Sequence, residues 1–231
     1  MEKVWIPSKI LYNTHMNEPS ELLEVYDMDD ELVAVMPRDE FYEQITKEFA
    51  NTGNITKKVK SIRVILMTTD GRIYVQRRSN KKEQNRGLYD KTIGGHYMSG
   101  HTWEMTVVRE MVEELGIPSV VLPPKDFKKA INTTNTDIIG IFKEIDYDNN
   151  FLSLRTTDSL PIVQPYMNTF YIGYYNGPIK FHDGEASGIE VHSVDELEKD
   201  IASNPDKYTE DLKVMIQKYR DHLIPADEIA K

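Results

Sequence analysis

Hydrophobic positions along the chain follow two different periods, and each period predicts a different kind of element. Residues 22–26 and 32–36 are short runs of Leu, Val and Met on either side of an acidic turn, which predicts two short strands. Residues 39–49 repeat an aromatic or aliphatic side chain every four positions, the spacing of one helix face. Asn and Gly at 51–54 then interrupt the pattern.

The central part of the chain contains the clearest hairpin and helix signals. Residues 62–66 alternate in the manner of a strand with at least one buried face, and Asp-Gly at 70–71 predicts a hairpin turn into a partner strand at 73–77. A helix is expected from Thr102 to Leu115, because a glycine follows directly and a proline lies just beyond.

The last third of the chain alternates between strand and helix signals. Residues 137–147 and 166–175 are rich in Ile, Phe and Tyr and predict strands, with 148–165 as a polar insert or hairpin. A capping box at Ser193 predicts a short helix, and Asn204-Pro205 is expected to open the last one. Strands, a helix, strands and further helices in this order indicate an α+β fold rather than regular βαβ units.

We therefore expect two parts. Residues 1–55 would form an N-terminal extension, a hairpin plus a helix, that packs on a core domain of residues 56–231 with C-terminal helices.

Composition and charge narrow the function classes. The 231 residues include no cysteine, which excludes disulfides, thiolate metal sites and a cysteine nucleophile. No apolar run approaches the ~18 residues of a membrane span, and the N-terminus lacks the pattern of an export signal, so the cytoplasm is the expected compartment. A formal net charge of -10 argues against a nucleic-acid polymer as partner, and the sequence leaves a homodimer open.

Three glutamates are the first candidates for chemistry. Glu110, Glu113 and Glu114 fall within about 100° of one another on the expected helix. Their mutual repulsion is relieved by a divalent cation, and Mg²⁺, with Mn²⁺ as a substitute, prefers such oxygen ligands. Glycines before the helix would let backbone carbonyls approach the ion. A solvated acidic helix face is the alternative interpretation of the same spacing.

The surrounding spacing favours the metal site. Residues 95–117 resemble the Nudix signature, with agreement at these positions: Gly95, Arg109, Glu110, Met111, Glu113, Glu114, Gly116 and Ile117. The resemblance implies a mixed β-sheet sandwiched between α-helices, and it implies that the signature residues are catalytic. It implies metal ligands at Glu110, Glu113, Glu114 and the backbone carbonyl of Gly95, with Arg109 orienting the glutamates. A further acid outside the signature is expected at Glu185, with Glu190 as the second choice.

One signature position departs from the family pattern. The first glutamate is replaced by His101, which has no negative charge with which to brace the glycine loop and Arg109. We expect His101 to be solvent-exposed at the helix start. Catalysis weakened by this change would leave a Nudix-fold module that binds a nucleotide or a protein without efficient turnover.

A broader similarity, over roughly residues 22–200, is to the isopentenyl-diphosphate-isomerase-like branch of the family. The isomerase itself needs a cysteine just before a Gly-His pair, and here that position is Gly94. A histidine expected before the first strand of the domain is also missing, because residues 57–60 read Lys-Lys-Val-Lys. The branch resemblance therefore implies a hydrolase and not a true isomerase.

Cations near the signature are candidates for substrate binding. Arg77 and Arg78 follow a predicted strand and offer bidentate contacts to phosphate, whereas Lys81 and Lys82 are equally compatible with a solvated basic loop. His96 would either approach the substrate or close the glycine loop. Together these features predict a Mg²⁺-dependent pyrophosphohydrolase that cleaves a diphosphate linkage between a nucleoside diphosphate and another group.

Overall fold

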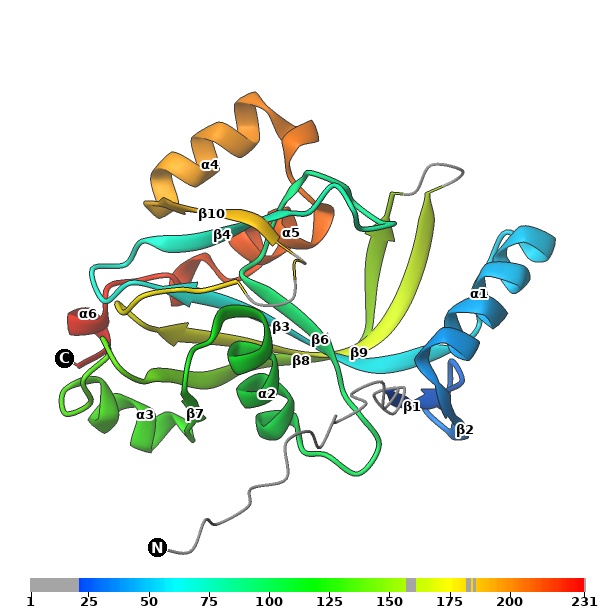
Figure 1. Cartoon of the computed structure of the whole chain (residues 1–231), viewed down its shortest axis with the longest axis horizontal. Coiled ribbons are helices and arrows are strands. Elements are labelled where there is room, and N and C mark those ends of the chain that lie inside the picture. The colour runs from blue at the N-terminus through cyan, green and yellow to red at the C-terminus, as the bar shows by residue number, and fades with distance from the viewer. Residues whose placement is uncertain (1–20, 157–160, 182–183, 185, 231) are drawn as a thin grey trace, which may run out of the picture.

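A computed structural model describes residues 21–156, 161–181, 184 and 186–230 of the chain (Figure 1). The strands are β1 (Leu22–Tyr26), β2 (Leu32–Pro37), β3 (Lys58–Met67), β4 (Ile73–Arg78), β5 (Tyr89–Asp90), β6 (Ile93–His96), β7 (Ser119–Val121), β8 (Gly140–Arg155), β9 (Ile162–Tyr174) and β10 (Ala186–His192). The α-helices are α1 (Arg38–Thr52), α2 (Trp103–Leu115), α3 (Pro124–Ile131), α4 (Val194–Ser203), α5 (Glu210–Lys218) and α6 (Ala226–Ala230), with short 3-10 turns at Pro205–Lys207 and Arg220–His222.

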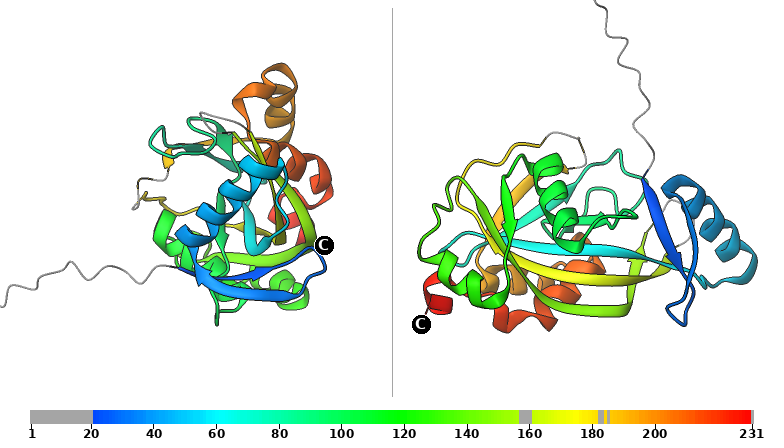
Figure 2. Two further views of the ribbon diagram at one scale, coloured as in Figure 1. Left: turned by 90° about the vertical axis from the view of Figure 1, so that its right-hand side faces the viewer. Right: turned by 90° about the horizontal axis from the view of Figure 1, so that it is seen from below.

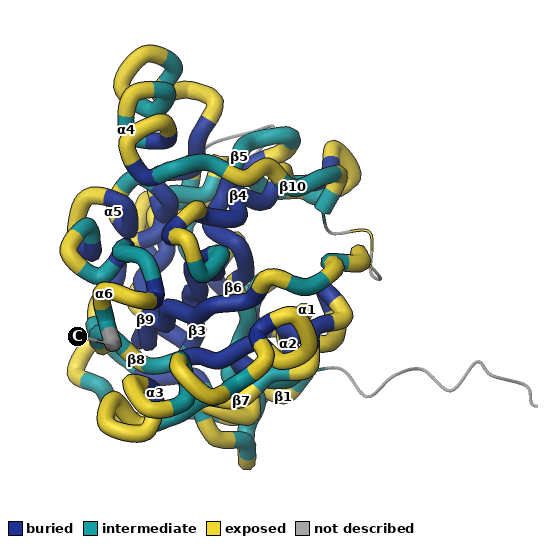
Figure 3. The backbone as a smooth tube through the Cα atoms, turned by 90° about the vertical axis from the view of Figure 1, so that its left-hand side faces the viewer, coloured by how far each residue is buried: buried dark blue, intermediate teal, exposed yellow. Residues whose placement is uncertain are grey.

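The strands form one mixed sheet. Its main path runs β10-β4-β3-β9-β8-β7, and β6 pairs with β3 as a branch from this path. The β3–β9 and β7–β8 pairs are parallel, whereas the other pairs are antiparallel. This central position leaves β3 buried along most of its length (Figure 3), so its side chains point into the layers on both faces of the sheet.

Helices cover both faces of the sheet. On one face, Val107, Met111 and Leu115 of α2 pack against Ile62 and other β3 side chains of the same face. On the other face, α4 and α5 pack on the sheet through a second apolar cluster that includes Leu197 and Leu212 (Figure 1). The predicted α+β class, with a mixed sheet between helices, is confirmed.

The first two strands and α1 lie together at one end of the molecule (Figures 1 and 2). β1 pairs with β2 and also with the start of β3, where Val25 lies opposite Val59. A separate apolar cluster, which includes Leu23, Phe41 and Ile45, joins this hairpin and helix to the sheet. Residues before the core domain are thus part of the same sheet as the core.

Helix α2 begins and ends where the sequence predicts. Thr102 is its N-cap, and its hydroxyl accepts a hydrogen bond from the Met105 backbone N–H at 3.2 Å. Gly116 follows the last residue with φ of 66°, a conformation that costs glycine little. These caps fix the register of the helix that carries the signature glutamates.

Of the two alternatives for residues 148–165, the hairpin is the one found, because β8 and β9 continue as an antiparallel pair through the described part of this segment, with Phe151 and Ser153 buried. One expectation about the second half of the chain was wrong in detail. The last long helix begins at Glu210 instead of Pro205. Pro205 opens only a 3-10 turn, and Thr209 caps α5 by accepting a hydrogen bond from the Leu212 N–H.

Among the described residues, no helix has both the length and the apolar character needed to cross a membrane.

Candidate active site

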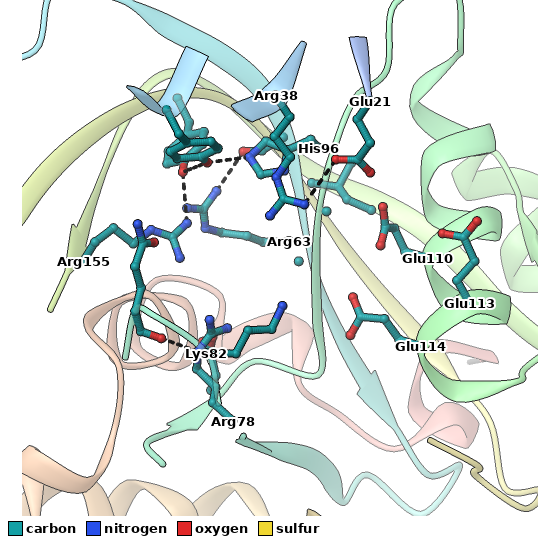
Figure 4. Close-up of a pocket in the computed structure, with 18 of the residues that line it drawn as sticks. Glu21, Arg38, Arg63, Arg78, Lys82, His96, Glu110, Glu113, Glu114 and Arg155 are labelled. Carbon is teal, nitrogen blue, oxygen red and sulfur yellow. Dashed lines mark hydrogen bonds and ion pairs between the residues drawn. The ribbon is translucent and has the colours of Figure 1, made fainter. Parts of the chain in front are cut away.

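A cavity of about 1000 Å³ opens between α2, α1, the end of β4 and the glycine strand β6. Its lining is divided by charge (Figure 4). Glu110, Glu113 and Glu114 lie on the α2 side, and a group of cations lies across the cavity from them: Arg63, Arg78, Lys82 and Arg155.

The three signature glutamates all line this cavity, but their environments differ. Glu110 and Glu114 are buried, whereas the side chain of Glu113 is 57% exposed. The Gln76 amide on β4 donates a hydrogen bond to Oε2 of Glu114 at 3.2 Å. The helix therefore presents two carboxylates held within the protein and a third at the rim.

Gly95 forms a close-fitting cradle for Glu110. β6 pairs with β3 so that Gly95 lies opposite Ile62, and a Cβ atom added at Gly95 would come within 2.4 Å of the Glu110 carboxylate. Any other residue would displace that carboxylate, so the glycine is required by the approach of strand to helix.

These residues fit a hard divalent cation by their donor chemistry. Carboxylate oxygens beside a glycine backbone are the ligands that Mg²⁺ prefers. Within the described ranges, no three His, Asp or Glu side chains are already grouped as a complete metal site. The predicted ligands Glu110, Glu113, Glu114 and Gly95 thus share one wall, and an ion would have to draw the carboxylates together.

Arg109 holds Glu110 in place, as the resemblance implies. Its guanidinium contacts Oε1 of Glu110 at 2.6 Å and donates to the His96 backbone carbonyl at 3.3 Å. It also lies 4.0 Å from a carboxylate oxygen of Glu113. Arg109 therefore connects the glycine strand to the glutamate helix and points the Glu110 carboxylate toward the cavity.

His101 lies in the cavity lining and is half-buried, so the expectation that it is solvent-exposed was wrong. Its backbone N–H donates to the Met98 carbonyl at 3.0 Å, which closes the loop before α2. Its Nδ1 atom is buried and has no hydrogen-bond partner among the described residues. This hydrogen bond forms a local turn directly before Thr102, the N-cap of α2.

A carboxylate from elsewhere in the chain contacts Arg109. Oε1 of Glu21, the residue before β1, lies 3.3 Å from the Arg109 guanidinium, and Oε2 lies 3.5 Å from Arg38. No sequence pattern predicts this contact, because it depends on the pairing of β1 with β3. Glu21 thus supplies a negative charge beside Arg109 that His101 does not.

We expect Glu21→Gln to lower kcat for a diphosphate substrate about tenfold, because Arg109 then loses one charged partner. Adding His101→Glu should restore most of the loss, since it places a carboxylate in the loop before α2, whereas His101→Glu alone should leave kcat equal or higher. Steady-state kinetics, with KM for Mg²⁺ as a second readout, on all four proteins of this double-mutant cycle measures the coupling. No loss in Glu21→Gln, or no rescue by His101→Glu, would contradict this role.

The structure separates the two arginines predicted to bind substrate. Side chains alternate along β4, so Gln76 and Arg78 face the cavity and Arg77 faces away, with its guanidinium 5.8 Å from the ring centre of Tyr89. The prediction that Arg77 binds substrate is therefore corrected. Lys81 and Lys82, in contrast, do line the cavity.

Arg78 is anchored at the cavity wall. Its guanidinium donates to the Gln84 backbone carbonyl at 3.2 Å and contacts Oδ2 of Asp90 at 3.3 Å. These contacts hold the side chain, 16% exposed, at the place where β4 ends. A fixed arginine of this kind loses little side-chain freedom when it binds an anion.

His96 lies where either of its predicted roles remains open. It ends the glycine strand, lines the cavity, and its Nε2 lies 2.7 Å from the hydroxyl of Tyr42 on α1. Burial, together with Arg38, Arg155, Arg63 and Arg109, lowers the pKa of His96 well below its usual value. The imidazole is therefore neutral at pH 7 and adds no charge to the cavity.

The two acids considered outside the signature are placed differently. Glu185 lies outside the described residues. Glu190 on β10 does not line the cavity, since its carboxylate accepts hydrogen bonds from Tyr89 at 2.5 Å and pairs with His192 at 3.0 Å.

A buried polar network lies beneath the cation wall, the group formed by Arg63, Arg78, Lys82 and Arg155. No sequence pattern predicted this network. Arg63 of β3 pairs with Asp211 of α5 at 2.9 Å. Lys91 contacts Asp90 at 3.1 Å and Asp211 at 3.4 Å. The only sequence signal is a charged residue within the apolar run of β3, which alternation alone assigns to a solvent face.

Comparison with known proteins shows the family of this chain. The NUDIX domain family model matches residues 57–212. An uncharacterised Nudix hydrolase of Nostoc is 25% identical over 132 residues, and one of Rhodococcus erythropolis is 34% identical over 103 residues. The crystal structure of a Deinococcus radiodurans protein, 18% identical, superposes with a TM-score of 0.56 and covers 86% of this chain and 98% of that one.

The chain belongs to the Nudix family, and the residues 95–117 that resemble the signature lie inside the matched region. The two sequence relatives are aligned over only part of their length. The alignment spans 57% of this chain and 65% of the Nostoc protein, and 44% of this chain and 50% of the Rhodococcus protein.

Proposed function

We propose that this protein is a Mg²⁺-dependent pyrophosphohydrolase that cleaves the diphosphate linkage of a nucleoside diphosphate joined to another group. The observation that carries the proposal is the division of the cavity between the glutamate wall of α2 and the cations across from it. A diphosphate is a polyanion that needs cations along its length and a metal at the reacting phosphorus.

Each group of residues around the cavity has a separate role in this proposal. Glu110, Glu113, Glu114 and the Gly95 carbonyl would hold the metal, which when bound would polarise the phosphate and lower the pKa of a water. Arg109 keeps the Glu110 carboxylate aimed at the cavity. Arg78, with Lys82 beside it, would contact phosphate oxygens and stabilise the charge that develops on the leaving group. Glu185 is proposed as the further acid.

A hydrolysis screen tests the proposal. Purified protein would be incubated with nucleotide sugars, dinucleoside polyphosphates, NADH, CDP-alcohols and free nucleoside di- and triphosphates. Phosphate-containing products should appear with Mg²⁺ or Mn²⁺ and vanish with excess chelator. Full turnover in chelator would overturn the mechanism. Tight binding without turnover of any compound would support the alternative, a binding module whose catalysis is weakened at His101.

Metal binding should also stabilise the fold. Mg²⁺ relieves the repulsion among the α2 carboxylates, so it should raise Tm by several degrees, given that about 1 kcal/mol shifts Tm by ~2–4 °C in a chain of this size. Glu113→Gln should reduce the shift. Glu104→Gln, an exposed residue on the same helix, should leave it unchanged. Calorimetric scans of wild type and the two variants measure the Mg²⁺-induced change in Tm. An identical change in all three proteins would show that the ion binds elsewhere.

The resemblance to the isopentenyl-diphosphate-isomerase-like branch is proposed only at the level of the shared scaffold. A side chain at Gly94 would come within 2.7 Å of the Lys91 side chain, and no cysteine is present to protonate an alkene. The cavity also has little apolar lining for an isoprenoid chain, since Ile62 and Met98 are its only aliphatic residues among those described. Isomerase activity is therefore not expected.

A further inference from the structure

The cation wall carries more positive charge than its carboxylates balance. Four cations meet there and line the cavity: Arg63, Arg78, Lys91 and Arg155. The carboxylates paired with this group in the described chain are Asp90 and Asp211. Arg155 forms no ion pair with a described carboxylate, and charge that is buried without a counter-ion is costly, so this part of the cavity favours the binding of an anion.

One hydrogen-bond donor of Arg63 is not used within the protein. The side chain is 1% exposed, and its Nε pairs with Asp211 at 2.9 Å. One terminal nitrogen donates to the Ser61 hydroxyl at 3.0 Å and to the Asn168 amide oxygen. The other terminal nitrogen is buried without a hydrogen-bond partner. Buried polar groups are rarely left this way unless something else binds them.

Arg155, at the end of β8, lies beside Arg63. Both guanidiniums contact the ring of Tyr166, at 4.9 Å for Arg63 and 5.4 Å for Arg155. Arg155 donates to the Tyr166 hydroxyl at 3.2 Å, while its Nε is buried with no partner. Two like charges thus share one aromatic ring, across the cavity from the signature glutamates (Figure 4).

We propose that Arg63 and Arg155 form a subsite for a phosphate monoester, so that the substrate is a diphosphate whose attached group carries a separate phosphate. This inference rests on the proposed function, because it assigns the reacting diphosphate to the glutamate wall. A phosphate monoester carries about -1.5 to -2 charges at pH 7 and offers oxygens to both guanidiniums, whereas a carboxylate carries one charge. Paired guanidiniums bind such an oxyanion with parallel N–H donors.

The subsite is formed by other elements than the cations assigned to the reacting diphosphate. Arg78 and Lys82 come from β4 and the loop after it, whereas Arg63 and Arg155 come from β3 and β8. Tyr166 is 1% exposed and its ring is occupied by the two guanidiniums, so it is not a platform for a nucleobase. The lining around the subsite therefore selects for charge and not for stacking.

Matched substrate pairs test the proposal. NADPH and NADH differ by one phosphate monoester, as do coenzyme A and dephospho-coenzyme A, and UDP-glucuronate and UDP-glucose differ by a carboxylate. With Mg²⁺, kcat/KM should favour the phosphorylated member of at least one phosphate pair by about tenfold or more, the value of a charge-assisted hydrogen bond. Arg155→Gln should abolish this preference, while Arg77→Gln, an arginine that faces away from the cavity, should retain it.

Arg63→Lys is the second variant, because it keeps a positive charge beside Asp211 and removes the planar guanidinium, including its unpaired terminal nitrogen. It should reduce the same preference, and an unchanged Tm would show that the fold is intact. Equal loss for both members of a pair in Arg155→Gln would mean that the arginines bind the reacting diphosphate, which overturns the proposal. A preference seen only in the carboxylate pair, or no preference in any pair, would overturn it as well.

A binding measurement separates this inference from the proposed function. Inorganic phosphate would be titrated calorimetrically into the full chain in excess chelator, where hydrolysis plays no part. Binding to wild type and to Arg77→Gln, weakened about tenfold or more in Arg155→Gln, would support the subsite even if no compound were hydrolysed. Equal binding by all three proteins, or none, would overturn the subsite even if hydrolysis were found.

Discussion

Glu114→Gln should lower kcat for a diphosphate substrate by about 10³-fold, equivalent to ~4 kcal/mol of barrier. The substitution keeps the shape of the side chain and an oxygen that can accept the hydrogen bond from Gln76, so the fold should persist. It removes one of the two buried negative charges that face the cavity from α2. Steady-state kinetics at saturating Mg²⁺, with a melting scan to verify folding, measures the effect.

The matched control is Glu104→Gln, the same chemical change about three turns away on the same helix, at an exposed position. It should leave kcat within about twofold, because surface substitutions rarely change a distant site. A loss of less than tenfold in Glu114→Gln would remove this residue from the proposed metal ligands. An equal loss in both variants would show that helix charge as a whole matters and that no particular carboxylate does.

Asp211→Asn should destabilise the folded protein by about 3–5 kcal/mol. The carboxylate is 3% exposed, pairs with Arg63 and Lys91, and accepts a hydrogen bond from the Ser153 hydroxyl at 2.7 Å. Its neutralisation leaves two buried cations with one carboxylate fewer. Urea unfolding should show this as a lower midpoint with an unchanged slope, and Asp206→Asn, at an exposed position, should change stability by less than about 0.5 kcal/mol.

The same residue predicts how stability depends on pH. Burial alone would raise the pKa of Asp211, but Arg63 and Lys91 outweigh it and hold the pKa well below its ordinary value. The contribution of the ionised carboxylate is therefore complete above the unfolded-state pKa of ~3.9 and is lost progressively as the pH falls below it. Wild type should lose stability below about pH 4, and Asp211→Asn should lose less over the same range.

Features that depend on local sequence were predictable, and those that depend on strand pairing were not. The caps of α2 at Thr102 and Gly116 are local signals, and so is the spacing of the signature glutamates. Alternation indicated that β3 has a buried face, but both faces are covered, so Arg63 lies in a polar network that the pattern could not reveal. Arg63 and Asp211 lie 148 positions apart, and the sequence around each residue does not indicate that the two form an ion pair.

The choice between Arg77 and Arg78 shows a finer limit. Neighbouring residues of a strand face opposite sides, so only one of the two can reach the cavity, and the pleat decides which. The sequence placed both at the end of the strand, but it could not say where the strand pairs. Pairing of β4 with β5 and β10 fixes that register, with Arg78 toward the cavity.

The match to the family begins at residue 57, yet Glu21, Arg38 and Tyr42 line the cavity from the hairpin and helix that precede it. This preceding segment has its own apolar cluster around Phe41 and Ile45. The segment is joined to the sheet by the pairing of β1 with β3, and Glu21 contacts Arg109 of α2. The boundary of the family match is therefore not a boundary of the cavity, and alterations before residue 57 reach the signature helix directly.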